Sequence, residues 1–428
     1  MKRFVKFLVM SLVIVIVAFA IFKVTKQYNL DVIHDEIDWS IDLKGCKDAT
    51  GFDMDKSGNL FISFKNNIRM VSIDGKDTQV LKDSNLNILD FVCDDKNLYI
   101  ATDNKVISYN METSESVDLI TNIPNNGINS EVKLLLGDEC LYFAVGSSTN
   151  SGIVNKEGEP CDIPSISFVL EDANYGERGT GIYKPYGVRN IDGEKIDEKG
   201  RIGNGTLMKY DLKHKQTSIY SHGIRNIEGL DINSKNKIYA IVGGMEDEGS
   251  RAVKDDTDYI YEINESAWYG WPDFSGGDPI TSPRFTDGTN KLSFVLKEHP
   301  NKTPTGPLYE HNSVSSLKGL AIDDEGFHLN ENQIIFGDNK QHKIFALDGR
   351  RAVPIGTLDE GSNIEKIMVN REGVFILDSG TGCIYKFEQK GDNNLFNLSP
   401  IYWIFASGFL ITILLVIIIK YKKNHIAK

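Results

Sequence analysis

One stretch of the chain, from His222 to Pro272, combines residues that could bind and polarise a ligand. It contains Arg225 and Asn226 at the start of a strand-like run, where a guanidinium and an amide offer several N–H donors to ligand oxygen atoms. Three acidic residues and an aromatic turn follow: Asp255, Asp256, Asp258 and Tyr269-Gly270-Trp271-Pro272. Singly, each feature also has an ordinary explanation, such as a hydrogen-bonded turn, a solvated acidic loop or a packing plug. Together, and in this order, they are hard to explain by coincidence.

The segment Gly223-Ile224-Arg225-Asn226-Ile227-Glu228-Gly229-Leu230 resembles a motif of the glucose/sorbosone dehydrogenase family, Gly-x-Arg-Asn-Pro-x-Gly-Leu, and lacks only its proline. The resemblance covers roughly residues 132–345. It includes a turn typical of sorbosone-type members, Gly146-Ser147-Ser148-Thr149-Asn150, and the aromatic-Gly-Trp-Pro element. Proteins of this family are six-bladed β-propellers that hold pyrroloquinoline quinone (PQQ) over a calcium ion.

The resemblance implies a role for four residues. Arg225 would bind and polarise the quinone oxygens, and Asn226 would donate a hydrogen bond to the cofactor. The main-chain carbonyls of Gly244 and Met245 would hold calcium, a hard cation that prefers oxygen ligands. The substrate would be a sugar or polyol, with the cofactor supplying the redox chemistry and the protein the placement.

The general base of the family is missing from this sequence. In the family a His precedes the strand that leads into the Gly-Asp turn of the third repeat, and its place falls here on Ile128 or Asn129. Neither side chain can take up a proton near neutral pH. His222, Glu246 and Asp247 are candidate replacements, although each could equally be a solvated loop residue.

Further cations for the cofactor carboxylates are harder to place. Lys318, Lys340 and Lys343 are candidates, although lysines are ordinarily surface residues. Motifs of other chemistries are absent from the sequence: there is no Gly-x-Ser-x-Gly elbow, no His-Glu-x-x-His pair and no phosphate loop.

A pattern of strand-like runs joined by Gly, Asp and Asn turns recurs six times. The first runs lie at residues 51–55, 88–92, 132–136, 227–232, 317–322 and 364–369; the second at 60–63, 98–101, 141–144, 238–241, 333–336 and 374–377; the third at 68–73, 105–109, 207–210, 259–263, 343–347 and 383–387. Six such units predict an all-β fold, a six-bladed β-propeller.

Two units carry long insertions, at residues 151–205 and 274–307, which are expected to form the rim of a site or solvated loops. The five cysteines show no Cys-x-x-Cys spacing, which argues against a zinc site. Cys46 and Cys383 lie near the two ends of the predicted ring and could pair where it closes. Buried free thiols are the alternative.

Both ends of the chain predict membrane segments. Phe7–Phe22 is apolar apart from one serine and follows three basic residues, as in a cleaved secretory signal or an uncleaved anchor, and both alternatives stay open. Ile401–Ile419 is long enough to span a bilayer, and the lysines after it indicate a cytoplasmic end. The predicted organisation is a signal or anchor helix at 1–25, an extracellular propeller at 40–392, a transmembrane helix at 400–420 and a cytoplasmic tail at 421–428.

The formal net charge of −13 and the lack of a basic stripe argue against nucleic-acid binding. Two hypotheses for function follow. The first is a membrane-anchored extracellular sugar or polyol dehydrogenase that uses PQQ and calcium, or a degenerate relative that has lost turnover with its base. The second is a non-catalytic propeller that binds a carbohydrate or protein partner at the cell surface.

Overall fold

The computed structural model describes residues 30–33, 37–197, 202–286 and 292–390, together with Val17 and Tyr28. Residues Leu30–Glu388 form one compact unit. Its secondary structure is built from β-strands, with a single 3-10 turn, η1 (Pro283–Phe285), among the described residues.

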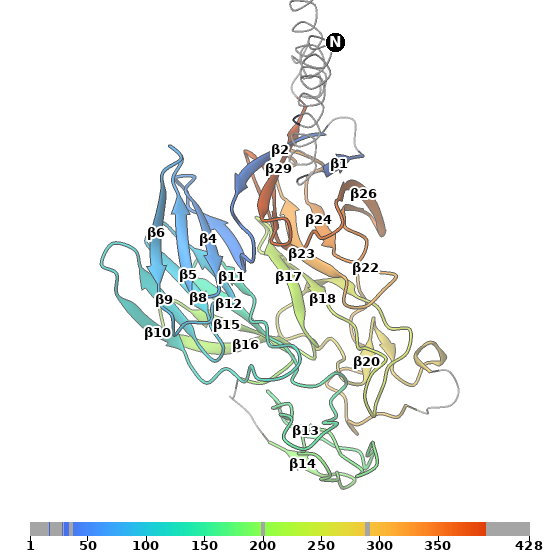
Figure 1. Ribbon diagram of the computed structural model, residues 1–428. Coiled ribbons are helices and arrows are strands. Elements are labelled where there is room, and N and C mark those ends of the chain that lie inside the picture. The colour runs from blue at the N-terminus through green and yellow to red at the C-terminus, as the bar shows by residue number, and fades with distance from the viewer. Residues whose placement is uncertain are drawn as a thin grey trace, which may run out of the picture. The chain divides into compact units, whose positions relative to one another are not determined.

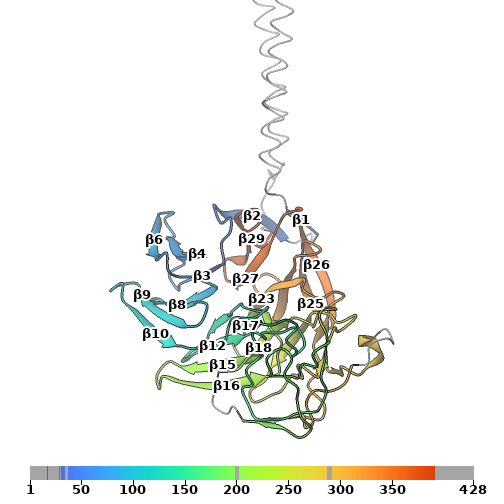
Figure 2. The same cartoon turned by 60° about the horizontal axis from the view of Figure 1, so that its bottom comes forward.

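Six sheets are arranged around a ring, as the two views of Figures 1 and 2 show. The first three blades are β3 (Gly51–Met54), β4 (Leu60–Phe64), β5 (Asn67–Val71), β6 (Asp77–Lys82); β7 (Asp90–Cys93), β8 (Asn97–Ala101), β9 (Val106–Asn110), β10 (Ser116–Ile120); and β11 (Leu134–Leu136), β12 (Cys140–Val145), β15 (Thr206–Asp211), β16 (Gln216–His222). The next three are β17 (Ile227–Ile232), β18 (Ile238–Val242), β19 (Tyr259–Ile263), β22 (Tyr309–Glu310); β23 (Leu317–Asp323), β24 (Gln333–Asp338), β25 (Lys343–Asp348), β26 (Arg351–Leu358); and β27 (Ile364–Asn370), β28 (Gly373–Asp378), β29 (Cys383–Gln389) with β2 (Ile37–Lys44). The prediction of an all-β six-bladed propeller is therefore confirmed.

Each blade buries both of its faces against its neighbours, which explains the apolar runs in the sequence. Between the third and fourth blades, for example, one buried cluster joins Tyr142 and Leu207 to Ile238 and Tyr261. The central strand β28 is buried along its whole length. Every run predicted from the sequence overlaps one of the three inner strands of a blade.

The ring closes with a strand from the opposite end of the chain. Strand β2 lies beside β29 as the outer strand of the sixth blade, and β1 (Leu30–Val32) pairs with β26 on the fifth. The Trp39 ring of β2 meets the Tyr385 ring of β29 edge-on, with 5.8 Å between their centroids. At the same junction Cys46 N–H donates to the carbonyl of Gly382 over 2.9 Å, and both Cys46 and Cys383 are buried free thiols.

The two insertions pack against each other instead of forming separate loops. The first lies between β12 and β15 and holds β13 (Phe168–Val169) and β14 (Lys195–Ile196); the second lies between β19 and β22 and holds β20 (Phe274–Ser275), β21 (Asp278–Pro279) and η1. Lys297 N–H donates to the Val169 carbonyl, and Leu170 bridges to Leu296. Arg251 and Asp273, both fully buried, form an ion pair of 2.8 Å beneath them.

The predicted membrane segments lie outside the described residues, apart from Val17. No helix in the described part of the chain has the length and apolar character needed to cross a bilayer.

We expect Trp39→Ala to lower the free energy of unfolding by about 2 kcal/mol. Truncation of a fully buried aromatic costs about 3 to 5 kcal/mol, and Trp39 is only half-buried. Chemical denaturation of the purified chain measures the change. The matched control is Ile73→Ala, since that side chain is 76% exposed and its loss is expected to cost less than about 0.5 kcal/mol. Equal effects of the two substitutions would mean that β2 does not hold the ring closed.

Candidate functional site at the propeller axis

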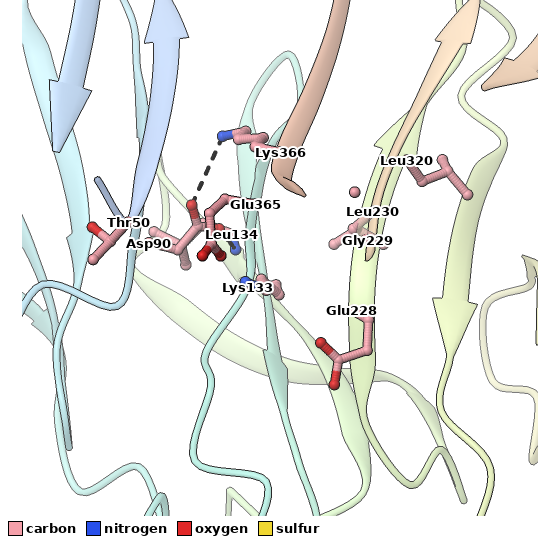
Figure 3. Close-up of a pocket in the computed structure, with 11 residues that line it drawn as sticks. Thr50, Asp90, Lys133, Leu134, Glu228, Gly229, Leu230, Leu320, Glu365 and Lys366 are labelled. Atoms are coloured by element: carbon pink, nitrogen blue, oxygen red, sulfur yellow. Dashed lines mark hydrogen bonds and ion pairs between the residues drawn. The ribbon is translucent and has the colours of Figure 1, made fainter. Parts of the chain in front are cut away.

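The innermost strands of all six blades converge on a narrow channel of about 30 Å³. Figure 3 shows charged side chains that line it from four different blades: Asp90 of β7, Lys133 next to β11, Glu228 of β17, and Glu365 with Lys366 of β27. Lys366 Nζ lies 3.8 Å from Asp90 Oδ1. Because inner strands of separate blades supply these residues, they do not form a local motif that the sequence would reveal.

A second space of about 310 Å³, which we call the axial cavity, shares two lining residues, Glu228 and Glu365, with the channel. Its wall is polar and comes from the third, fourth, fifth and sixth blades. The lining residues are Asn129, Glu131, Arg225, Asn226, Glu228, Gly243, Asp258, Ser315, Ser316, Leu317, Lys318, Asn339, Asn363 and Glu365. A cavity of this volume is at the lower end of the range for small-molecule sites.

Arg225 and Asn226, which the sequence predicts to bind a ligand, both line the axial cavity. They follow the turn from β16 into β17, in which Gly223 has a φ of +69° and a Cβ would lie 2.3 Å from the Trp268 ring. Gly243 opposite Asn226 is equally constrained, because a Cβ there would lie 2.4 Å from Asn226 Oδ1. The glycines therefore make room for the site.

The guanidinium of Arg225 is buried but bonded only to neutral acceptors. Nε donates to the Asn150 carbonyl (3.1 Å), Nη2 to Asn150 Oδ1 (3.2 Å) and Nη1 to Asn226 Oδ1 (3.3 Å). Within the described ranges no carboxylate forms an ion pair with it, and burial lowers its pKa. Since a guanidinium has five N–H donors, two are left for a ligand.

Asn150 positions the Arg225 side chain through two hydrogen bonds. The sequence indicated this residue only as the last one of a turn typical of the family. In addition to the bonds to Arg225, its carbonyl accepts from Trp271 Nε1 (3.3 Å), and its side chain bonds the main chain of Glu246 in both directions. The turn itself is held by buried Asp162, which accepts from Ser148 N–H and Thr149 Oγ1, both at 2.5 Å. A change in this turn is therefore transmitted to Arg225.

Asp256 and Asp258 are buried anchors, not solvated loop residues, whereas Asp255 is exposed. Asp256 accepts from Met245 N–H (2.7 Å) and the Tyr259 hydroxyl (2.5 Å). Asp258 accepts from four main-chain N–H groups: those of Gly244, Ser315, Ser316 and Leu317. Burial raises the pKa of both carboxyls. Their role is to fix the loops around the cavity.

Gly244 and Met245, the predicted calcium-binding pair, do not line the axial cavity. Met245 faces a separate space of about 20 Å³ that Arg225 also lines, and its side chain is buried. The Gly244 carbonyl points away from Asp256, because it lies opposite the Met245 N–H in a trans peptide and that N–H donates to Asp256. No cluster of three His, Cys, Asp or Glu side chains suited to a metal occurs in the described segments.

At the place of the family's general base, Asn129 lines the axial cavity and Ile128 is 60% exposed. Asn129 Nδ2 donates to Ser147 Oγ over 2.8 Å. None of the candidate replacements, His222, Glu246 and Asp247, is among the lining residues. His222 is buried at the end of β16, where burial lowers its pKa to about 4. Glu246 reaches the rim through a hydrogen bond from Ser315 Oγ.

Of the three candidate lysines, only Lys318 lines the axial cavity. It is already engaged, with ion pairs of 2.8 Å to Glu131 and 2.5 Å to Glu228. Lys340 is exposed and donates to the Val314 carbonyl, and Lys343 belongs to strand β25.

The described residues fit only one part of PQQ. Arg225 and Asn226 offer donors for quinone oxygens. For the three carboxylates of PQQ, in contrast, the wall offers one further cation, Lys318, which is already paired, beside the acidic residues Glu131, Glu228 and Glu365. Like charges at short range repel strongly in a partly desolvated site. The wall therefore suits the quinone oxygens and not the carboxylates, and the two carbonyls of Gly244 and Met245 alone fall short of the six to eight oxygens that calcium takes.

We expect Asp162→Asn to stabilise the protein at pH 7. Burial raises the pKa of Asp162 to about 6, above its ordinary value near 3.9, so its ionisation destabilises the folded state. This cost is absent below about pH 4 and appears as pH rises through about 6. The variant is therefore expected to exceed the parent by about 1 to 3 kcal/mol at pH 7 and to match it near pH 4. Denaturation at both pH values tests this, and a difference independent of pH would contradict it.

Known proteins share this architecture. Residues 194–302 match the model of the family described as Glucose / Sorbosone dehydrogenase, a segment that contains Arg225, Asn226, Gly244 and Met245. No match to a curated protein is found.

Among solved structures, the holo form of the PQQ domain of pyranose dehydrogenase from Coprinopsis cinerea has a TM-score of 0.57 at 12% identity, covering 85% of this chain and 97% of that one. The calcium structure of a Trichoderma reesei protein of carbohydrate-active enzyme family AA12 has a TM-score of 0.56 at 13% identity, and the match covers 85% of this chain and 98% of that one. The apo form of the soluble aldose sugar dehydrogenase from Escherichia coli has a TM-score of 0.54 at 13% identity, and the match covers 83% of this chain and 100% of that one. The first of these neighbours is a PQQ domain in its holo form and the second is a calcium structure, so both predicted cofactors occur among them. The predicted resemblance to the glucose/sorbosone dehydrogenase family is thus confirmed in residues 194–302, and the fold is that of sugar dehydrogenase propellers.

Proposed function

We propose that this chain is a sugar dehydrogenase-like propeller that binds a sugar or polyol in its axial cavity without oxidising it. The observation that carries the proposal is the pairing of an unused donor surface on Arg225 with an amide, Asn129, where the family has its base. An amide can hold a hydroxyl group but cannot remove its proton near neutral pH.

The wall of the cavity supports a polyhydroxylated ligand. Arg225 has two N–H groups to donate to hydroxyl oxygens, and the amides and hydroxyls of the wall can both donate and accept. These neutral polar residues are Asn129, Asn226, Asn339, Asn363, Ser315 and Ser316. A sugar, which carries a donor and an acceptor on every hydroxyl, matches such a surface.

Oxidation with PQQ and calcium is the second candidate, favoured by the same two unused donors of Arg225. In that case Arg225 and Asn226 would hold the quinone oxygens, and the carbonyls of Gly244 and Met245 would contribute to the metal site. The cofactor would supply the hydride acceptor. A residue other than Asn129 would have to act as the general base that removes the proton of the substrate hydroxyl.

We also propose that the propeller lies on the outer side of the cytoplasmic membrane. The support is the sequence alone: the apolar runs 7–22 and 401–419 with their basic flanks.

The full chain, supplied with calcium and PQQ, is expected to bind sugars but not to reduce a redox dye with any of them. Calorimetric titration with a panel of aldoses measures binding, and dye bleaching measures turnover. Asn129→His places a base at the family position and is expected to stay inactive, because the carboxylates of the wall disfavour PQQ. Dye reduction by the parent chain would establish the second candidate, and the lack of any sugar binding would refute the first.

Arg225→Gln is expected to weaken sugar binding by about tenfold or more, since hydrogen bonds from charged donors contribute about 1.5 to 3 kcal/mol. Arg225→Lys keeps the charge and serves as a check on folding. The matched control is Arg371→Gln, whose side chain is 79% exposed, and it is expected to bind as the parent does. Unchanged affinity in Arg225→Gln would place the sugar elsewhere.

A further inference from the structure

Three lysines along the axis form ion pairs with three of its four carboxylates, and a single carboxylate is left over. Lys318 pairs with Glu131 and Glu228, Lys133 with Glu131 at 3.0 Å, and Lys366 with Asp90 at 3.8 Å. Glu365 has no ion-pair partner in the described part of the molecule. Four carboxylates thus face three ammonium groups, and Glu365 is the one that no ammonium group contacts, since Lys133 and Lys318 act on it only at longer range.

Glu365 still has an oxygen to offer. Its Oε1 accepts hydrogen bonds from two neutral groups, Asn363 Nδ2 (2.5 Å) and Ser379 Oγ (2.9 Å). No donor in the described segments reaches its Oε2. Because a carboxylate has room for about four hydrogen bonds, this side chain has unused acceptor capacity where it lines the cavity.

The opposite charge is left over at Arg225. No carboxylate forms an ion pair with it in the described part of the molecule, and the acidic residues nearest to it, Glu246, Asp256, Glu228 and Asp258, act on its charge only at longer range. Arg225 is buried to 5% exposure, and its bonds go to Asn150 and Asn226. A buried guanidinium that no carboxylate contacts directly, and that has two N–H groups unused, points to a ligand that completes its hydrogen bonding.

One cavity therefore has an unpaired guanidinium and an unpaired carboxylate in its wall, with neutral amides and hydroxyls around them. We infer that the axial cavity selects a sugar that carries a protonated amine, with the ammonium group on Glu365 and a hydroxyl or ring oxygen on Arg225. The inference rests on the proposed function and specifies its ligand class. Charge-assisted hydrogen bonds of an ammonium to a carboxylate are stronger than those of a hydroxyl, which provides the selectivity.

The test compares glucosamine, glucose and N-acetylglucosamine as ligands of the full chain by calorimetric titration near neutral pH. Glucosamine is expected to bind about tenfold more tightly than glucose, a difference of about 1.4 kcal/mol. N-acetylglucosamine, which keeps the nitrogen but not the charge, is expected to lose this advantage. High salt should also reduce the preference, because it screens the ion pair.

Glu365→Gln removes the charge with little change of shape and is expected to bring glucosamine down to the affinity of glucose. The matched control, Glu372→Gln, changes an exposed glutamate that follows the same strand, β27, and is expected to keep the tenfold preference. Equal binding of glucosamine and glucose by the parent chain, or a preference that survives Glu365→Gln, would overturn the inference and leave sugar binding intact. Failure of all three sugars to bind would instead refute the proposed function.

Discussion

The pairing of β2 with β29 is the constraint on which the rest of the molecule depends. In a propeller each inner strand is held in place by the two blades beside it, so an open ring would leave the first and sixth blades with one uncovered face each. Closure packs Phe52 and Ile62 of the first blade against Phe375 and Ile384 of the sixth. The convergence of six inner strands then creates both the charged channel and the axial cavity.

The three inner strands of every blade could be predicted from the sequence because burial on both faces makes them continuous apolar runs. The outer strands could not, since solvent covers one side of them. Strand β10 is exposed over its first three residues, and β6 alternates between exposed and half-buried positions. Strand β2 could not be predicted for another reason. Its partner, β29, lies near the other end of the chain, and a local sequence pattern does not show which distant segments pair.

A local motif in the sequence indicated some of the residues that line the cavity, whereas no pattern indicated the residues that several blades bring together. The motif indicated Arg225 and Asn226, and counting along the third repeat gave Ile128 or Asn129; of these, Arg225, Asn226 and Asn129 line the cavity, and their roles stay predictions. The acidic residues Asp255, Asp256 and Asp258 suggested a solvated loop, whereas Asp256 and Asp258 are buried because main-chain amides of neighbouring segments donate hydrogen bonds to them. The sequence did not indicate Glu365 or Lys133, because neither belongs to a local motif. They come together only when the blades meet at the axis.

The position of β2 also determines when the ring can form. This strand leaves the ribosome early, but residues 383–389, beside which it must lie, are made only after all the other strands of the propeller. Until then the first blade has no neighbour on one side, and the entropy of joining such distant segments opposes closure. Sealing of the ring is therefore the final step of folding, and a polypeptide that stops short of residue 383 would hold five complete blades around an axis that cannot shut.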